Sequence, residues 1–173
     1  MMKRQSPRHS LLSFVIFAGA LAITAPTLAK NTCDALYNAG IKSVQAPHHV
    51  TSTTTRRGGI PRTGEAIYSG GIEYLKLKGK WTRSSMTPKD RLEAAQEKLK
   101  THPDTCTFLG DQTIDGEVVS VFKAHSNEYG TNQLVRVVKS SGLIQGGTMS
   151  LPDGATVETR YDYTNVRAPA DVK

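Results

Sequence analysis

Histidine, serine and aspartate are the side chains of this sequence that could carry out chemistry, and their spacing limits which chemistry that is. His48 and His49 are adjacent in a stretch rich in β-branched residues. Adjacent strand residues point to opposite faces, so these two imidazoles cannot readily bind one metal ion. We therefore expect both, together with His102 and His125, in solvated positions, and the sequence predicts no metal site.

Nucleophilic catalysis needs a nucleophile, a base and an orienting carboxylate brought together. Ser, His and Asp all occur, but no local catalytic signature surrounds any of them. The glycine pairs Gly58-Gly59, Gly70-Gly71 and Gly146-Gly147 lie in turn or bulge contexts, which differ from a phosphate-binding loop. The sequence thus predicts no catalytic residue, no cofactor and no enzymatic activity; a small hydrolase is the least favoured alternative.

The two cysteines are an even pair, Cys33 and Cys106, without the spacing of a redox motif or of a zinc site. In a compartment that permits oxidation, such a pair predicts a structural disulfide. It would attach an N-terminal helix to the middle of the domain. Two free or redox-active thiols are the alternative.

The N-terminal segment indicates the compartment. Lys3, Arg4 and Arg8 precede an apolar run, Leu11–Ile23, and small residues occupy positions −3 and −1 of a cleavage after Ala29. These features are typical of a secretory signal peptide, and the run is short for a membrane span. We expect residues 1–29 to be removed and residues 30–173 to form one periplasmic domain that is not an integral membrane protein. A retained anchor helix and lipidation at the first cysteine are alternatives.

Charge narrows the classes of partner. Of the net charge of +7, three units lie in residues 1–29, and +4 remains on the rest of the chain. An exported protein with this modest, scattered charge is not expected to bind nucleic acid, but anionic lipid head groups would attract it weakly. The early strands are the more basic part, and we interpret their lysines and arginines as a guard against edge-to-edge aggregation. These residues are Arg56, Arg57, Lys76, Lys78, Lys80 and Arg83.

Periodicity and turn residues predict an α+β fold. Helices are expected over 32–44 and from Pro88 to about Lys100, where Thr87 and Asp90 can form a capping box. The predicted strands cover 48–57, 65–69, 72–78, 81–84, 106–113, 117–126, 131–139, 143–150 and 156–163. Turns at this spacing favour a single curved antiparallel sheet of roughly seven to nine strands, a half-barrel covered by the two helices.

Aromatic and aliphatic residues on the predicted strands are the candidates for a ligand site. A curved sheet under helices can leave an apolar cleft, although the same residues could simply fill the core. The ligand-cleft candidates are Tyr68, Tyr74, Leu75, Leu77, Trp81, Phe122, Val135 and Val137.

Three stretches also carry a resemblance to a known family. They are Tyr74–Ser84, Cys106–Gly110 with the following Asp115–Glu117, and the C-terminal turns and strand ending in Arg160–Val166. They resemble small exported proteobacterial proteins and, more broadly, LolA-type outer-membrane lipoprotein carriers and their lipid-binding relatives. The resemblance covers roughly residues 30–169 and implies a LolA-like half-barrel whose cavity accepts acyl chains. The chain is shorter than those carriers, and no functional residue of theirs can be aligned with it.

Two functions are therefore expected, in order of preference. The first is a periplasmic binding protein that holds an apolar or acyl ligand between sheet and helices, without catalysis. The second is an accessory protein with a filled core that binds another envelope protein through a sheet edge.

Overall fold

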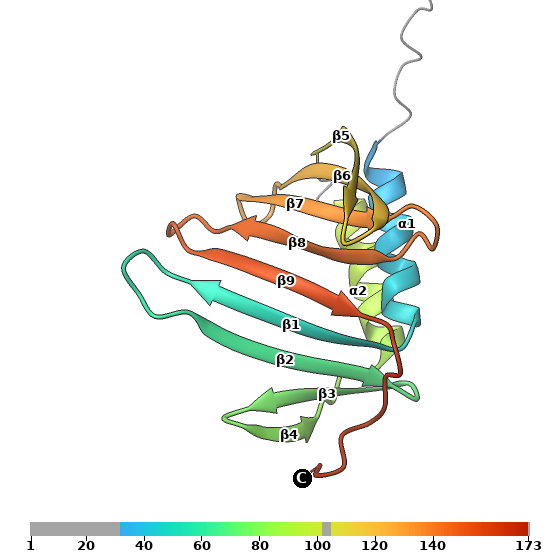
Figure 1. Cartoon of the computed structure of the whole chain (residues 1–173), viewed down its shortest axis with the longest axis vertical. Coiled ribbons are helices and arrows are strands. Elements are labelled where there is room, and N and C mark those ends of the chain that lie inside the picture. The colour runs from blue at the N-terminus through green and yellow to red at the C-terminus, as the bar shows by residue number, and fades with distance from the viewer. Residues whose placement is uncertain (1–31, 102–104, 173) are drawn as a thin grey trace, which may run out of the picture.

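Every strand of the described chain belongs to one antiparallel sheet (Figure 1). The computed structural model describes residues 32–101 and 105–172, so the predicted signal peptide (1–29) and His102 lie outside the described residues. The elements are α1 (Thr32–Gln45), β1 (His48–Thr55), β2 (Arg62–Ser69), β3 (Ile72–Leu77), β4 (Lys80–Arg83), α2 (Pro88–Thr101), β5 (Thr105–Ile114), β6 (Glu117–Ser126), β7 (Thr131–Val138), β8 (Ile144–Ser150) and β9 (Thr156–Asp162). The predicted α+β class with two helices and a curved antiparallel half-barrel sheet is confirmed.

Two meanders make up the sheet, and one strand pair joins them. The strand order is β4-β3-β2-β1-β9-β8-β7-β6-β5. The first meander runs from β1 to β4 and the second from β5 to β9, and β1 pairs with β9 from His49↔Asp162 to Thr55↔Thr156. This pairing leaves β4 and β5 at opposite edges, so the segment containing α2 has to pass from one edge of the sheet to the other.

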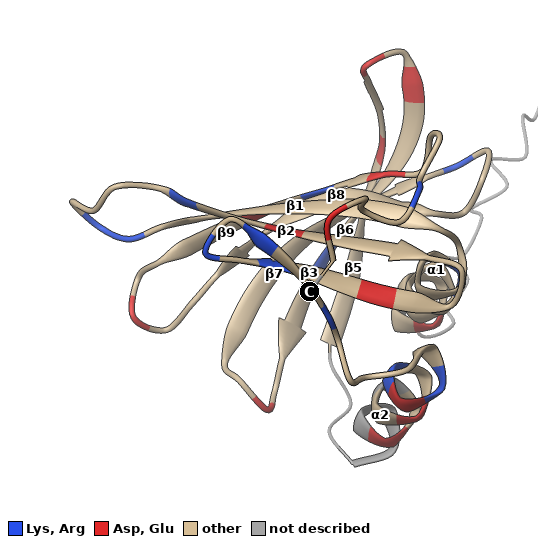
Figure 2. Ribbon diagram, turned by 90° about the horizontal axis from the view of Figure 1, so that it is seen from below, with Lys and Arg blue, Asp and Glu red and all other residues tan. Residues whose placement is uncertain are grey.

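Both helices lie on the same side of the sheet, which we call the helix-side face (Figure 2). α1 packs directly on the strands, where its buried Ala39 meets Phe122 of β6 and Val137 of β7. Ser43 Oγ also accepts a hydrogen bond of 2.8 Å from the backbone N of Ile144. α2 lies against α1 and farther from the strands. The sheet is therefore covered in two tiers, with α1 as the inner one.

The start of α2 has the predicted capping box. Asp90 N donates to Thr87 Oγ1 at 3.2 Å, and Thr87 N donates to Asp90 Oδ2 at 2.8 Å. These two bonds satisfy backbone donors that a helix start leaves without partners. The prediction from Thr87-Pro88-Lys89-Asp90 is confirmed.

A second, smaller core lies on the opposite face. Val119, Val121 and Val138 are buried there and pack with Ile114. The β5–β6 turn has φ values of 52° at Asp115 and 81° at Gly116, as a tight type I′ hairpin turn requires. Asp115 Oδ2 also lies 3.5 Å from Arg160 Nη2, so this hairpin folds over the opposite face as far as β9.

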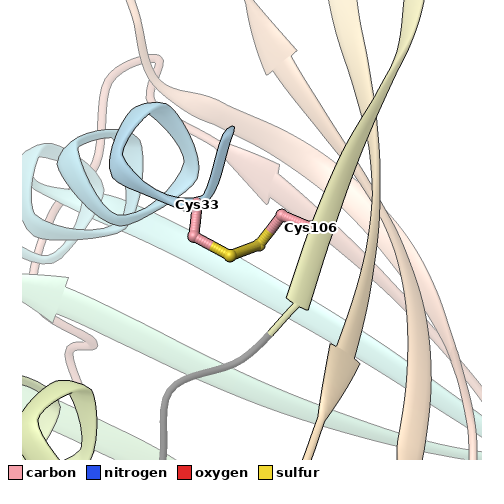
Figure 3. Close-up of a disulfide and its surroundings, with 2 residues drawn as sticks. All are labelled: Cys33 and Cys106. Carbon is pink, nitrogen blue, oxygen red and sulfur yellow. A yellow bond between two sulfur atoms is a disulfide. The ribbon is translucent and has the colours of Figure 1, made fainter. Parts of the chain in front are cut away.

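The predicted disulfide joins α1 to β5 (Figure 3). Cys33 and Cys106 are bonded, with their Cα atoms 5.1 Å apart. Cys33 is the second residue of α1 and Cys106 the second of β5, so the bond fixes the N-terminal end of α1 to the edge strand. The prediction of a structural disulfide is confirmed.

Replacing the disulfide should destabilise the fold in a defined way. The two cysteines are 73 residues apart, and the chain-entropy argument for a loop of this length gives a loss of about 4 kcal/mol in the free energy of unfolding. We expect Cys33→Ser, Cys106→Ser and the double variant to lose equal amounts in urea unfolding. A double variant much less stable than either single variant would mean that the cysteines contribute separately.

Candidate functional site

The eight ligand-cleft candidates do not share one face of the sheet. Because side chains alternate along a strand and the pairing registers are known, each can be assigned to a face. Six lie on the helix-side face: Tyr68, Leu75, Leu77, Phe122, Val135 and Val137. Tyr74 and Trp81 lie on the opposite face, at diagonal positions of the β3–β4 pair, where their partners are Arg83 and Lys76. The predicted group is therefore divided between two surfaces.

The six residues on the helix-side face play different parts. Phe122 and Val137 are buried core residues under α1. Val135 packs against that core and is half-buried, and Leu75 is also half-buried. Leu77, near the end of β3, is 58% exposed. Only Val135 among the eight lines one of the hollows described below.

The two residues on the opposite face have local partners. Tyr74 is buried, and the Lys76 ammonium lies 5.5 Å from the centre of the Trp81 ring, as in a cation–π contact. Val172, near the C-terminus, forms a bridge with Trp81 along the edge of β4. These contacts give Trp81 a structural role at the edge of the sheet.

An apolar groove runs along β8 on the helix-side face. Two hollows, of about 150 and 620 Å³, share Gln133 and Met149 and together form this groove. Its inner end lies at Ile144 and Tyr161, close to α1, and its outer end at the β8–β9 turn. We call it the β8 groove. It is lined by Tyr129, Thr131, Gln133, Leu134, Val135, Ile144, Gly146, Gly147, Thr148, Met149, Leu151, Pro152, Asp153, Thr159 and Tyr161, and Asp153 brings a carboxylate to its outer end.

Gly147 forms part of the floor of the β8 groove. A Cβ atom added there would lie 2.3 Å from the backbone oxygen of Leu134, too close for any side chain. The neighbouring strands therefore approach more closely at this glycine than a substituted residue allows. Because Gly147 has no side chain, the space above it, between Val135 of β7 and Thr159 of β9, stays open and belongs to the smaller hollow.

A cluster of aromatic rings closes the inner end of the groove. The centre of the His48 ring lies 5.4 Å from Tyr68, 5.6 Å from Tyr161 and 6.0 Å from Tyr163. Tyr163 Oη donates a 2.8 Å hydrogen bond to the carbonyl of Ile144. Burial raises the pKa of Tyr163 to about 12, so its hydroxyl stays protonated and keeps donating. The cluster forms a polar end wall for an otherwise apolar groove.

His48 is a neutral part of this wall. Its side chain is 7% exposed, so the expectation of a solvated position is wrong for this residue. Burial, and next the Arg91 cation, hold its pKa below 6.5, against the opposing hydrogen bond to Ala46. Nδ1 lies 2.7 Å from that carbonyl, which can only accept, so Nδ1 carries the proton.

An ion pair anchors α2 beside the aromatic cluster. Arg91 of α2 pairs with Glu73 of β3, and the residue Glu73 is only 5% exposed. A buried carboxylate is costly unless it is paired, so losing either partner would leave an uncompensated charge. This pair is a direct connection from α2 to the sheet.

Two other hollows differ from the β8 groove in size or polarity. An apolar one of about 170 Å³ lies between α1 and α2, lined in part by Leu36, Ile41 and Leu92. A polar one of about 590 Å³ lies on the opposite face, where Arg136, Glu158 and other charged side chains surround it. Within residues 32–101 and 105–172, no three His, Cys, Asp or Glu side chains gather as metal ligands.

Sequence reasoning missed most of the groove. Ile144, Met149 and Leu151 were not among the candidates, because β8 contains only two large apolar residues among glycines and polar residues. The available signal was the pair Gly146-Gly147 inside a strand, which often marks a close approach of backbones.

We compared the chain with known proteins by sequence and by structure. No family model and no curated protein matches the sequence. Among solved structures, the chain is similar to MucB in complex with MucA(peri), with 16% identity, a TM-score of 0.47, and coverage of 80% of this chain and 57% of the MucB chain. It is similar to lipoprotein LppX of Mycobacterium tuberculosis, with 12% identity, a TM-score of 0.45, and coverage of 79% and 99%.

A third similar structure comes from the family that the sequence resembles. It is a LolA superfamily protein of Nitrosomonas europaea, with 12% identity, a TM-score of 0.32, and coverage of 82% of this chain and 96% of that one. The matched region spans less than two thirds of the MucB chain. Neither helix of the described chain is long and apolar enough to cross a membrane. We assign the fold from the sheet and helices of this chain and not from the similar structures.

The free energy of unfolding should decrease as the pH is lowered, because of His48. Because its folded-state pKa lies below 6.5, the unfolded chain takes up the proton first as pH decreases. The free energy of unfolding should therefore decrease below about pH 6.5 and stop responding to this group once the pH passes the folded-state pKa. His48→Phe keeps a ring in the cluster and should flatten this dependence in urea unfolding.

His125→Gln is the matched control, since it removes a half-buried histidine from β6. This variant should keep the wild-type dependence on pH. Equal pH dependence in the wild type and in His48→Phe would contradict the assignment.

Proposed function

We propose that this chain is an exported binding protein that holds an apolar or acyl ligand in the β8 groove, without a catalytic step. The observation that supports this most directly is the continuity of two hollows along one strand on the face that α1 covers. A groove that is mostly apolar and continues along one strand suits an extended hydrocarbon chain better than a compact polar molecule.

The lining chemistry supports the same ligand class. Val135, Ile144 and Met149 are half-buried and present apolar surface that a ligand would cover. At about 25 cal/mol for each Å² of apolar surface removed from water, an acyl chain burying roughly 200 Å² would gain about 5 kcal/mol. The flexible methionine can adapt to chains of different shape.

The disulfide supports a compartment that permits oxidation. A periplasmic location after cleavage behind Ala29 is the form of export that we propose, since residues 1–29 have the pattern of a signal peptide. A ligand in this setting would come from the cell envelope, where acyl chains are abundant.

The accessory role is the second candidate, and the edge strand β5 is the observation that favours it. β5 is the last strand in the sheet order, and Phe108 and Leu109 on it are 46% and 53% exposed. An irregularity in the pairing between Phe108 and Gly110 interrupts this edge, a device that hinders strand addition. A partner would therefore contact the apolar side chains more than the backbone.

Native mass spectrometry of the chain purified from the periplasm, followed by organic extraction, would test the ligand. A stoichiometric acyl species would support the proposal and identify the ligand class. A protein that stays free of ligand after incubation with envelope lipids would overturn it. Photo-crosslinking from position 109 would then test for an envelope partner on β5.

A charge placed in the β8 groove should abolish ligand binding. We expect Met149→Asp to weaken the affinity for a fluorescent fatty acid at least tenfold. The bound acyl chain would displace water from the new carboxylate, and this desolvation is costly. Ser150→Asp is the matched control: it adds the same charge to the next residue, which is exposed and points to the opposite face. Both variants should unfold within about 1 kcal/mol of the wild type; equal binding by the two would contradict the assignment of the groove.

A further inference from the structure

The tip of the β1–β2 hairpin combines exposed apolar surface with unpaired positive charge. It extends beyond the neighbouring strands at one end of the sheet (Figure 1). Ile60 at the tip is 88% exposed, and Arg56, Arg57 and Arg62 surround it. The sequence has no acidic residue between Asp34 and Glu65, and within the described part of the chain none of the three arginines belongs to an ion pair.

The tip also has a hollow of its own. Its volume is about 430 Å³, and Thr54, Arg56, Gly59, Ile60 and Arg62 line it. Thr54 and Arg62 face each other in the β1–β2 pairing, so two of the lining residues come from opposite sides of the hairpin. Arg56 and Arg62 both line this hollow, and arginine is the residue that binds phosphate groups through paired hydrogen bonds.

This hollow lies at the same end of the sheet as the outer end of the β8 groove. The pairings Met149↔Val157, Val157↔Thr54 and Thr54↔Arg62 place these four residues in one row across the sheet. All four lie on the helix-side face, and two strand spacings of about 4.8 Å separate Met149 from Thr54. A group bound at Arg62 would therefore lie on the same face and at the same end of the sheet as the groove, three strand spacings from Met149.

The neighbouring hairpin adds to the same end of the molecule. The β2–β3 pairing places Leu77 two residues beyond Leu75, toward the end of β2 that carries Arg62. Leu77 is exposed, and Lys78 and Lys80 follow it. Figure 2 shows blue segments at the β1–β2 tip and red segments on other turns at this end, and the β8–β9 turn carries the exposed Asp153. The charge of this end is thus positive over two adjacent hairpins.

We propose that the β1–β2 tip is a docking site for the anionic head groups of a phospholipid bilayer. Arg56 and Arg62 bind lipid phosphate in the tip hollow, and Ile60 enters the boundary between head groups and acyl chains. This inference goes beyond the proposed function and does not require a ligand in the β8 groove. Its consequence is that the outer end of the β8 groove faces the membrane surface.

Co-sedimentation of the full chain with vesicles tests this docking. We expect binding to vesicles of phosphatidylcholine with phosphatidylglycerol, and little binding to phosphatidylcholine alone. Each basic residue near an anionic surface raises partitioning roughly fivefold, so Arg56→Gln/Arg62→Gln should lower it about 30-fold. Ile60→Asp should lower it about tenfold or more, because it removes the apolar contact and adds a charge that the anionic lipid repels. Both changes lie on exposed positions, and thermal unfolding would verify that the variants are folded.

Lys89→Gln/Lys123→Gln is the matched control, since it removes the same charge from exposed positions on α2 and β6. It should change partitioning less than about threefold. An equal loss in the control and in the arginine variant would mean unspecific attraction and would overturn the proposal, as would equal binding to both kinds of vesicle or to neither.

Two further measurements test the alternatives to bilayer docking at the tip. The first tests whether the hollow binds a soluble phosphate compound, and the second tests whether the groove contacts the bilayer. Binding of inorganic phosphate to the chain in calorimetry, with no binding to the anionic vesicles, would assign the hollow to a soluble phosphate compound and would overturn bilayer docking. Met149→Gln, which changes the groove without adding a charge, should bind the anionic vesicles like the wild type, so a failure of the ligand proposal leaves this result unchanged. Loss of vesicle binding in Met149→Gln would mean that the groove, and not the tip, makes the contact.

Discussion

The pairing of β1 with β9 is the constraint on which the rest of the structure depends. It joins two meanders that would otherwise be separate sheets, and it sends β4 and β5 to opposite edges. The connection between those two strands must then cross the sheet, and the chain uses α2 for this passage. Because α1 already occupies the sheet surface, α2 rests on α1 and reaches the strands through the Arg91–Glu73 pair. The β8 groove lies beside this two-tier cover.

Local signals predicted the elements well because short-range chemistry decides them. Thr87 and Asp90 define the start of α2 through their own hydrogen bonds, and the alternation of Val157, Thr159 and Tyr161 with charged residues defines the faces of β9. The disulfide followed from there being only two cysteines. These conclusions need no knowledge of which strands are neighbours.

The site was harder to predict because it depends on pairing between distant strands. Tyr74 and Trp81 look like groove residues in the sequence, but the register of β3 places them on the face away from the helices. His48 looks like a solvent-exposed residue at the start of a strand, yet β9 and the end of α1 bury it. The inner hollow of the groove lies over Gly147, a residue without a side chain, and hydrophobic patterns cannot predict such a space.

The disulfide also has a consequence for how the chain matures. With two cysteines in the whole sequence, oxidation can give only one intramolecular disulfide. No wrong intramolecular pairing exists that would have to be rearranged by disulfide exchange. Cys106 precedes β6 through β9, so the bond can form while those strands have yet to emerge during synthesis or translocation. An oxidant alone should suffice for this protein, without an isomerase, and early oxidation would hold α1 near β5 before the sheet that α1 covers is complete.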